Sequence, residues 1–457
     1  MAKLIGGRAV VIGGGLGGLA AAAALADHFA QVVVLERDRL PRAALPRDGV
    51  PQGKHPHVLL LGGQRALAAL APGFEEALAA AGAVPMCLGL DGHIDWPGHD
   101  PLPQRDLGAT VYSASRALIE ETLRRRVIAL ANVTLREGCR AEALLVSGDG
   151  ARVEGVRHSA LADGGTTTSA DLVIDASGRG ALTTRLLEET GRQLPEETAI
   201  GIQLAYATAV YAIPEDAPDE WKFAVLFPNP RESNRRALLI PIEGNRWIVS
   251  MVSFHGEMPP DDPAGFLEFA RTLRTPTIFQ AIRNAELLEP ITRFAYPGST
   301  WRHFERLADF PRGLLPIADA VCRFNPVYGQ GMSVAAQEAA LLRRLLGDLA
   351  GHDDPLGALA GAFFREIPAI LASPWSTAQA DLAYPQTTGA RPADFAQIMQ
   401  FSSALVQLAV REPDVHQIWG EVVNLVRPPT VYREPALQRR VQAVMAEMTA
   451  APRHAGA

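Results

Sequence analysis

The first part of the chain alternates between short apolar runs and segments of small residues. Residues 9–12 and 31–35 are rich in β-branched side chains and predict two buried strands. Between them, residues 19–26 consist only of alanine and leucine, which favours a helix. This order of strand, helix and strand predicts a βαβ unit with parallel strands.

Extended patterns return further along the chain. Residues 133–174 predict a meander of strands joined by glycine-containing turns, and 172–174 predict a returning parallel strand. Further strands, rich in β-branched and aromatic residues, are expected at 200–213, 223–227, 237–242 and 247–254. Beyond residue 353 we expect a helical region interrupted at Pro374 and over 385–392, with helices at 395–410, 415–425 and 435–448.

A glycine-rich turn follows the first strand. Gly13, Gly15 and Gly18 satisfy the spacing G-x-G-x-x-G, and Leu16 lies inside it. In a dinucleotide-binding turn the three glycines permit a tight bend, a close backbone approach to a pyrophosphate, and close packing of helix on strand. The second strand ends at Glu36, where a carboxylate can accept hydrogen bonds from a ribose, and Arg37 follows it. The alternative is a turn with no ligand.

A second ligand-binding segment is expected at residues 313–346. A strand over 313–318 ends at Asp319, and a turn leads into a helix over 333–346. A carboxylate there can accept a hydrogen bond from a hydroxyl group of a bound dinucleotide. The N-terminus of the helix can stabilise the electron-rich edge of the ring system of that ligand. The candidate contacts in the turn are Pro326, Gly329, Gly331 and Met332.

The returning strand ends in Asp175, followed by small residues. Small residues there would let a ligand approach the carboxyl edge of the sheet, so Asp175 is a third candidate contact. The alternative is that Asp175 only caps the following turn. Together the three segments indicate an enzyme that binds a flavin dinucleotide.

Composition narrows the class of protein. The net charge of −7 and pI near 5.9 give no general basic surface, so nucleic-acid binding is not expected. Three widely spaced cysteines show no metal-ligand pattern, which predicts a reducing, cytoplasmic location without structural disulfides. No signal peptide or integral membrane segment is expected, and no metal site.

With these motifs in place, the chain resembles the group A flavoprotein monooxygenases, the class of para-hydroxybenzoate hydroxylase, squalene epoxidase and bacterial tailoring hydroxylases and epoxidases. The resemblance covers about residues 8–350 and departs from the family pattern at Ala318, where glycine is usual. It implies an α/β fold: a glutathione-reductase-type FAD-binding Rossmann domain, a β-sheet substrate domain and a helical C-terminal region.

The resemblance also implies an activity. FAD, bound without a covalent link, would be reduced by NAD(P)H and would react with O2, and a flavin C4a-hydroperoxide would hydroxylate or epoxidise an electron-rich aromatic or alkene substrate, as in secondary metabolism. The alternatives are a flavin-dependent dehydrogenase or reductase, a halogenase, or a flavin-binding protein without turnover. The halogenase signature Trp-x-Trp-x-Ile-Pro is absent from the sequence.

Further site residues follow from the family layout. Arg116, at the start of an expected helix over 117–127, would contact the FAD diphosphate. Gln52, His55 and His57 lie on a loop similar to one found beside the flavin ring. The substrate pocket candidates are Tyr206, Tyr211, Phe227 and Trp247.

The expected domains are discontinuous. Residues 1–77, 104–190 and 296–350 would bind FAD, residues 78–103 and 191–295 would bind substrate, and 351–457 would form the helical region. The expected partners are a small-molecule substrate and O2, with a substrate carried on a carrier protein as a weaker alternative.

Overall fold

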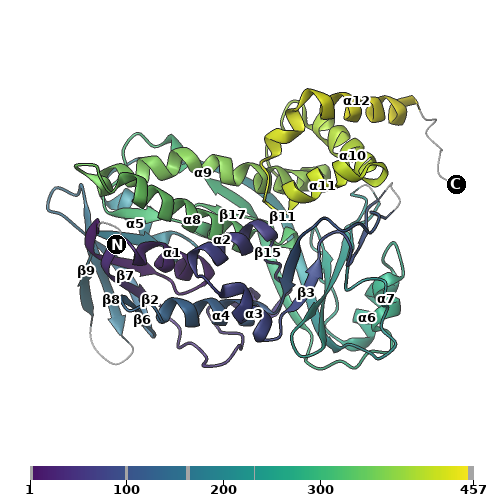
Figure 1. Cartoon of the computed structure of the whole chain (residues 1–457), viewed down its shortest axis with the longest axis horizontal. Coiled ribbons are helices and arrows are strands. Elements are labelled where there is room, and N and C mark those ends of the chain that lie inside the picture. Colours follow the sequence, from purple (N-terminus) through teal and green to yellow (C-terminus); the bar gives the residue numbers. More distant parts are fainter. Residues whose placement is uncertain (1–3, 98–100, 161–164, 231, 451–457) are drawn as a thin grey trace. The chain divides into compact units, whose positions relative to one another are not determined.

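A computed structural model describes residues 4–97, 101–160, 165–230 and 232–450 (Figure 1). The chain forms two compact units. Unit 1 contains residues 1–84, 112–199 and 298–374, and unit 2 contains residues 85–111, 200–297 and 375–457. Of the expected C-terminal region, residues 351–374 fall in unit 1 and residues 375–457 in unit 2. The functional division of the chain into domains remains a prediction.

Unit 1 is built on a five-stranded parallel sheet with the order β16-β10-β1-β2-β6. Its strands are β1 (Gly6–Ile12), β2 (Phe29–Leu35), β6 (Val133–Arg136), β10 (Leu172–Asp175) and β16 (Leu314–Pro316). The continuous apolar runs of β1, β2 and β10 suit strands that are covered on both faces. The expected βαβ unit and the returning parallel strand are confirmed.

Helices pack together beside this sheet in unit 1. They include α1 (Leu16–Ala26), α2 (Leu61–Leu70), α3 (Phe74–Ala80), α4 (Arg116–Ile128), α5 (Ala181–Glu189) and α8 (Gly331–Leu349). The alanine-rich α1 is buried along almost its whole length, because its small side chains let α8 and β2 approach closely. This packing places the starts of α1 and α8 near the carboxyl ends of the parallel strands.

The expected meander forms a separate antiparallel sheet in unit 1. Its strands are β7 (Cys139–Val146), β8 (Val153–Ala160) and β9 (Thr166–Ser169). Val153 and Val156 of β8 share one apolar cluster with Val10 of β1 and Val33 of β2. The meander therefore packs on the parallel sheet through apolar side chains.

Unit 2 contains an antiparallel set of strands that ends in one parallel edge. The strands are β4 (Gly92–Asp95), β11 (Glu197–Ala212), β12 (Phe223–Leu226), β13 (Arg235–Ile242), β14 (Arg246–Ser253) and β15 (Thr292–Arg302). β11 pairs with β14, β14 with β13, β13 with β12, and β12 runs parallel to β4. The four strands expected from the sequence are confirmed. β3 (Val84–Cys87) and β5 (Thr110–Ser113) lie at the two ends of the unit 2 segment 85–111 that contains β4, and β17 (Cys322–Arg323) belongs to unit 1.

One face of this sheet is a large apolar core. Its strand residues pack against α6 (Pro263–Arg271) and α7 (Thr277–Ile282), which contribute Phe266, Phe269 and Ile278. The opposite face carries the alternate residues of the same strands, since neighbouring side chains in a strand point to opposite faces.

The last helices of unit 2 form their own cluster. α10 (Phe395–Arg411), α11 (Pro413–Val423) and α12 (Pro435–Ala450) share buried residues such as Leu405, Val415 and Val441 (Figure 1). The sequence prediction of these helices is confirmed.

The expected interruption at Pro374 is wrong. α9 (Pro355–Gln379) continues through both Pro368 and Pro374. Among the described residues, the stretch 355–383 is the one helical segment long and apolar enough to cross a membrane, with a mean hydropathy of 1.3. The buried helix of a protein core passes the same test, and in α9 Phe364 stacks on Phe304 within unit 1.

Candidate functional site

The glycine-rich turn has a different structural requirement at each glycine. Gly13 has a φ of +102°, and a Cβ there would lie 2.6 Å from the carbonyl oxygen of Ala176. A Cβ on Gly18 would lie 1.8 Å from the Gly13 carbonyl oxygen. Around Gly15, by contrast, the nearest atom to such a Cβ is Nη2 of Arg47, at 3.6 Å. Gly13 and Gly18 therefore serve the fold, whereas Gly15 leaves room for a ligand to approach the backbone.

Glu36 lies at the end of β2 beneath this turn and is buried. Its carboxylate accepts hydrogen bonds from the backbone N–H groups of Gly14, at 2.8 Å, and Asp38, at 2.9 Å. Leu16 is also buried, as the first residue of α1. The carboxylate is thus fixed at the sheet edge where the sequence predicted a ribose contact.

Arg47 is a site residue that the sequence reasoning missed. Its guanidinium pairs with Glu36 at 3.1 Å, Asp38 at 2.7 Å and Glu120 at 2.8 Å. Arg37, which was predicted, has a side chain that is 63% exposed and donates to the Gly49 carbonyl. No local sequence pattern marks Arg47, because the acids that hold it come from the end of β2, the following loop and α4.

Arg116 and Met332 are brought together, although 216 positions separate them. Nη1 of Arg116 lies 3.4 Å from the Met332 sulfur, and Nη2 donates to Glu120 at 2.8 Å. Burial lowers the pKa of Arg116, while the Glu120 carboxylate opposes this shift. Glu120 therefore holds two cationic side chains, those of Arg47 and Arg116, beside the glycine-rich turn and the start of α8.

The start of α8 is open. A Cβ on Gly331 would meet no atom within 4 Å, and the Gln330 side chain does not cap the helix. Gly329 has a φ of +65°, and Pro326 begins the one-turn helix before it, where the Asn325 side chain accepts from Val327 N–H. The positive end of the α8 dipole thus faces a space that a ligand could fill.

Asp319 lies in a short 3-10 turn, η3 (Ala318–Ala320), directly after β16. Burial raises the pKa of its carboxyl, and the positive charges of Arg323 and Arg116 oppose that shift. Ala318 has a φ of +56°, a conformation that favours glycine. The departure of this sequence from the family pattern therefore falls on a residue whose backbone is strained.

The histidine loop lies close to the same segments. Gln52 lies in η1 (Pro51–Lys54), and the His55 carbonyl is 2.8 Å from Nδ1 of His57. Burial lowers the pKa of His55 to about 4, with Lys54 adding to the shift. Burial and the charge of Arg116 lower the pKa of His57 to about 3. Both rings are therefore neutral near pH 7.

Asp175, a predicted cofactor contact, has hydrogen-bond partners within its own turn. Its buried carboxylate accepts from the N–H and hydroxyl of Ser177, and from the N–H and hydroxyl of Thr183. These four hydrogen bonds occupy both oxygens and fix the turn that leads into α5. These hydrogen bonds agree with the capping alternative, and a contact of Asp175 with a cofactor stays a prediction.

The four substrate pocket candidates lie on opposite faces of the unit 2 sheet. Tyr211 and Trp247 belong to the apolar core that α6 and α7 cover, where Trp247 stacks on Trp221. Tyr206 lies on the other face, and Phe227 lies beneath the guanidinium of Arg236, whose Cζ is 4.0 Å from the ring centre. Tyr211 and Trp247 therefore have the plain core role that aromatic strand residues often have.

The face that carries Tyr206 is polar and buried. Tyr206, Val252 and Arg236 form one row across β11, β14 and β13, and in the next row Thr208 is hydrogen-bonded to Ser250. Arg236 and the buried Asp381 both act on the pKa of Tyr206, which burial raises well above its usual range. The sequence did not single out Arg236 or Asp381: the sheet register brings Arg236 near Tyr206, and Asp381 comes from the short helix η5 (Ala380–Ala383), far along the chain.

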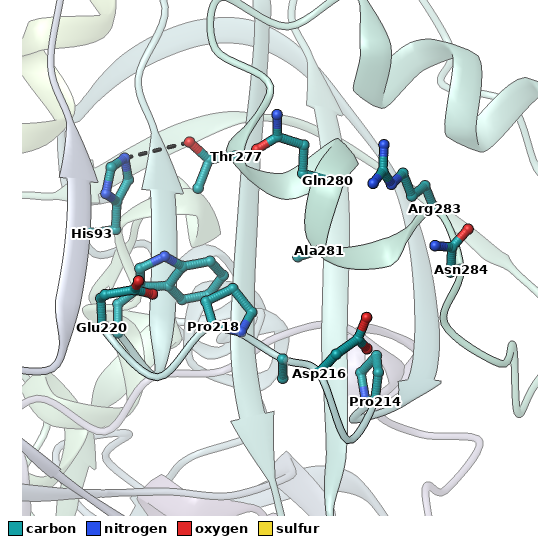
Figure 2. A pocket seen from close by; sticks show the side chains of 12 residues that line it. His93, Pro214, Asp216, Pro218, Glu220, Thr277, Gln280, Ala281, Arg283 and Asn284 are labelled. Atoms are coloured by element: carbon teal, nitrogen blue, oxygen red, sulfur yellow. Dashed lines mark hydrogen bonds between the residues drawn. The ribbon is translucent and has the colours of Figure 1, made fainter.

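Unit 2 also contains a surface cavity of about 390 Å³ between α7 and the loop before β12 (Figure 2). His93 and Thr277 approach each other on one side, and Asp216 and Glu220 lie on the loop opposite Gln280 and Arg283. No predicted cofactor or substrate residue lines this cavity.

Metal chemistry receives no support from the described residues. No group of three His, Cys, Asp or Glu side chains in that part of the chain could hold an ion. Cys87, Cys139 and Cys322 are all free thiols.

Comparison with known proteins places the chain among its relatives. Residues 11–60 match the NAD(P)-binding Rossmann-like domain, which covers the glycine-rich turn and Glu36. The chain is 33% identical over 358 residues to Protein Rv3254 of Mycobacterium tuberculosis, spanning 74% of this chain and 73% of the relative. The chain belongs to the Rv3254 family.

Solved structures of similar fold include flavin-dependent proteins. The flavin-dependent brominase Bmp2 matches 97% of this chain and 99% of its own, with a TM-score of 0.67 at 16% identity. A flavoprotein/dehydrogenase from Cytophaga hutchinsonii matches with the same coverage, a TM-score of 0.68 and 13% identity. The myxobacterial chondrochloren halogenase CndH matches 97% of this chain and 96% of its own, with a TM-score of 0.57 at 17% identity. The expected α/β fold with a Rossmann-like FAD-binding domain is confirmed.

Proposed function

We propose that this member of the Rv3254 family is an FAD-dependent monooxygenase that uses NAD(P)H and O2 to hydroxylate or epoxidise an electron-rich aromatic or alkene substrate. The observation that carries the cofactor assignment is the open start of α8 at Gly331, next to Met332 and to Arg116, whose side chain is 11% exposed. An uncapped helix start beside a cation that is largely shielded from solvent suits an anionic ligand.

The residues of unit 1 fit the parts of FAD. The start of α1 at Gly15, with Arg47 beside it, and Arg116 would bind the diphosphate. Glu36 and Asp319 would accept hydrogen bonds from hydroxyl groups of FAD. The start of α8 would stabilise the electron-rich edge of the flavin ring. When bound, FAD supplies electron transfer from NAD(P)H to O2 and transfer of one oxygen atom.

The face of unit 2 around Tyr206 is our proposal for the substrate side. Its aromatic rings suit a flat unsaturated substrate, and the buried Arg236 and Asp381 are polar groups that could orient it. His55 and His57, both neutral, would contribute hydrogen bonds and apolar surface without adding charge near the flavin.

Two measurements test the proposal. Purified protein loaded with FAD should oxidise NADH or NADPH faster when phenols or polyenes from a panel are added, and isotopically labelled O2 should place one heavy atom in the product. Product formed without O2, or with oxygen taken only from water, would favour a dehydrogenase. Protein that binds FAD but oxidises neither nicotinamide with any compound of the panel would favour a binding role.

A halogenase is the second candidate, because Bmp2 and CndH are named as a brominase and a halogenase and share the fold. Against it, the tryptophans of unit 2 at 221 and 247 stack on each other in the apolar core and do not form the halogenase motif. Adding bromide or chloride to the same assay decides the question: a halogenated product would overturn the monooxygenase proposal.

A further inference from the structure

The backbone of the turn that carries Asp319 is hydrogen-bonded to the buried carboxyl group of Glu338. The Ala318 N–H donates to Oε2 of Glu338 at 2.5 Å, and the Ala318 carbonyl accepts from Val321 N–H at 2.8 Å. Glu338 lies in the middle of α8 and has no exposed surface. Both backbone groups of Ala318 are thereby satisfied while its φ stays at +56°.

The methyl group of Ala318 ties this turn to the glycine-rich segment. A Cβ on Gly17 would lie 3.1 Å from Cβ of Ala318 and 3.4 Å from Cβ of Ala335. Ala318 therefore packs into the gap that the missing side chain of Gly17 leaves between α1 and α8. A residue with a side chain at 318 is strained at this φ, and the hydrogen bond that the Ala318 N–H donates to Glu338 stabilises that conformation.

We infer that Glu338 is a positioning residue for the cofactor site: it holds the Ala318–Asp319 turn in the left-handed conformation from which Asp319 binds FAD. This inference rests on the proposed function, because it gives Asp319 the role of a cofactor ligand. It concerns only the turn, and Glu338 itself does not contact the ligand.

The charge of Glu338 should matter as well as its position. Burial raises the pKa of Glu338 to about 8, the Ala318 N–H lowers it, and the charge of Asp319 raises it further. Oε1 of Glu338 accepts no hydrogen bond from any described residue. The neutral acid therefore suits this site near pH 7, and ionisation would place a second negative charge beside Asp319.

Few other charged groups surround Glu338. The charge of Glu338 contributes to raising the pKa of the Cys322 thiol of β17. The positive charges of Arg116 and Arg323 lower the pKa of Asp319. The helix α1 has no charged residue, and Arg65 of α2 is exposed. The ionisation of Glu338 beside Asp319 should therefore change FAD affinity with pH in the alkaline range.

The test is a set of four variants: Glu338→Ala, Glu338→Gln, Ala318→Gly, and Ala318→Gly combined with Glu338→Ala. The dissociation constant for FAD is measured by fluorescence titration of the apoprotein, and thermal unfolding is followed without FAD. Glu338→Ala should weaken FAD binding about tenfold, and Glu338→Gln should restore it to within about threefold, because an amide keeps the shape of the neutral acid.

Glycine at 318 should make Glu338 less necessary. We expect the double variant to bind FAD several-fold more tightly than Glu338→Ala alone, since glycine adopts a φ of +56° without strain. Wild-type affinity should also fall between about pH 7 and pH 9, and that of Glu338→Gln should not. Wild-type-like affinity in Glu338→Ala, or no rescue by Ala318→Gly, would overturn the inference.

Thermal unfolding of the apoprotein separates this inference from the proposed function. The two substitutions should be non-additive in the melting temperature even without FAD, because they act on one turn. If the two substitutions are non-additive but the wild-type protein does not bind FAD, the proposed function and the cofactor role of the turn are refuted. FAD binding with strictly additive substitutions would refute only the inference.

Discussion

The guanidinium of Arg116 lies 3.4 Å from the sulfur of Met332, so the start of α4 and the start of α8 lie side by side. Glu120 holds Arg116 from the other side, and through Arg47 the same carboxylate reaches the glycine-rich turn. The proposed diphosphate and flavin-ring ends of the cofactor site are thus fixed to each other by side chains before any ligand binds.

We expect the protein to purify yellow and to release its flavin on denaturation. The sequence has no recognisable motif for covalent attachment, and the proposed contacts are all hydrogen bonds and charges. Heat or acid precipitation, followed by chromatography of the supernatant, should recover free FAD. Flavin that remains on the precipitated chain would contradict the proposed mode of binding.

The two proposed hydroxyl acceptors can be tested separately. Glu36→Ala and Asp319→Ala should each weaken FAD binding by roughly 10- to 150-fold, because a hydrogen bond to a charged group contributes about 1.5–3 kcal/mol. Glu36→Ala should also lower thermal stability, since Glu36 pairs with Arg47 and accepts hydrogen bonds from the backbone N–H groups of Gly14 and Asp38. Unchanged FAD affinity in both variants, measured by fluorescence titration, would remove the basis of the cofactor assignment.

A side chain at Gly331 should fill the space assigned to the flavin ring. Because a Cβ there meets no protein atom within 4 Å, Gly331→Leu should fold with a melting temperature close to that of the wild type. It should bind FAD more weakly, and any NAD(P)H oxidation that remains should release hydrogen peroxide in place of product. The matched control is Gly351→Leu, at an exposed position that is equally open.

If Gly331→Leu binds FAD as tightly as Gly351→Leu and the wild type do, the ring does not lie at the start of α8. A common loss of affinity in both leucine variants would point to an indirect effect on stability.

The buried His55 should make the protein sensitive to acid. Its pKa is lowered to about 4, so between about pH 6.5 and 4 the unfolded chain binds a proton that the folded chain does not. Stability should therefore fall as the pH falls through this window, by at most about 3 kcal/mol from this group. Urea unfolding at a series of pH values should show a shallower acid slope for His55→Gln.

The exposed His352 provides the comparison, because His352→Gln should leave that slope unchanged. Equal slopes in the wild type and in His55→Gln would show that His55 is not buried as a neutral ring.

Local sequence patterns predicted the parts of the site that depend on backbone geometry. Gly13 and Gly18 were recognisable because their spacing reflects contacts within one turn, and Asp319 because it ends a strand before a glycine-hinged helix start. Arg47 and Arg236 were not recognisable from the sequence, because their place in the candidate site depends on the side chains that surround them in the fold. Those neighbours come from other elements and leave no periodic signal in the sequence.

Asp175 carries the expected residue type at the expected strand end, and Thr183, eight residues later, donates to its carboxylate, so its contact with a cofactor stays a prediction. One error has a local physical explanation. Pro374 was expected to break a helix, yet α9 continues beyond it, which shows that the packing of a long apolar helix can outweigh the cost of an internal proline.

The interleaving of the two units has a consequence for how the chain can fold during synthesis. The parallel sheet begins with β1 at residues 6–12, but its edge strand β16 and the helix α8 are made only after the strands β11 to β14 of unit 2. A nascent chain that ends before residue 314 would expose the edge of β10 and leave α1 without the helix that covers it. Such chains have unpaired strand edges and exposed apolar surface, so stalled or truncated products of this protein should aggregate or be degraded.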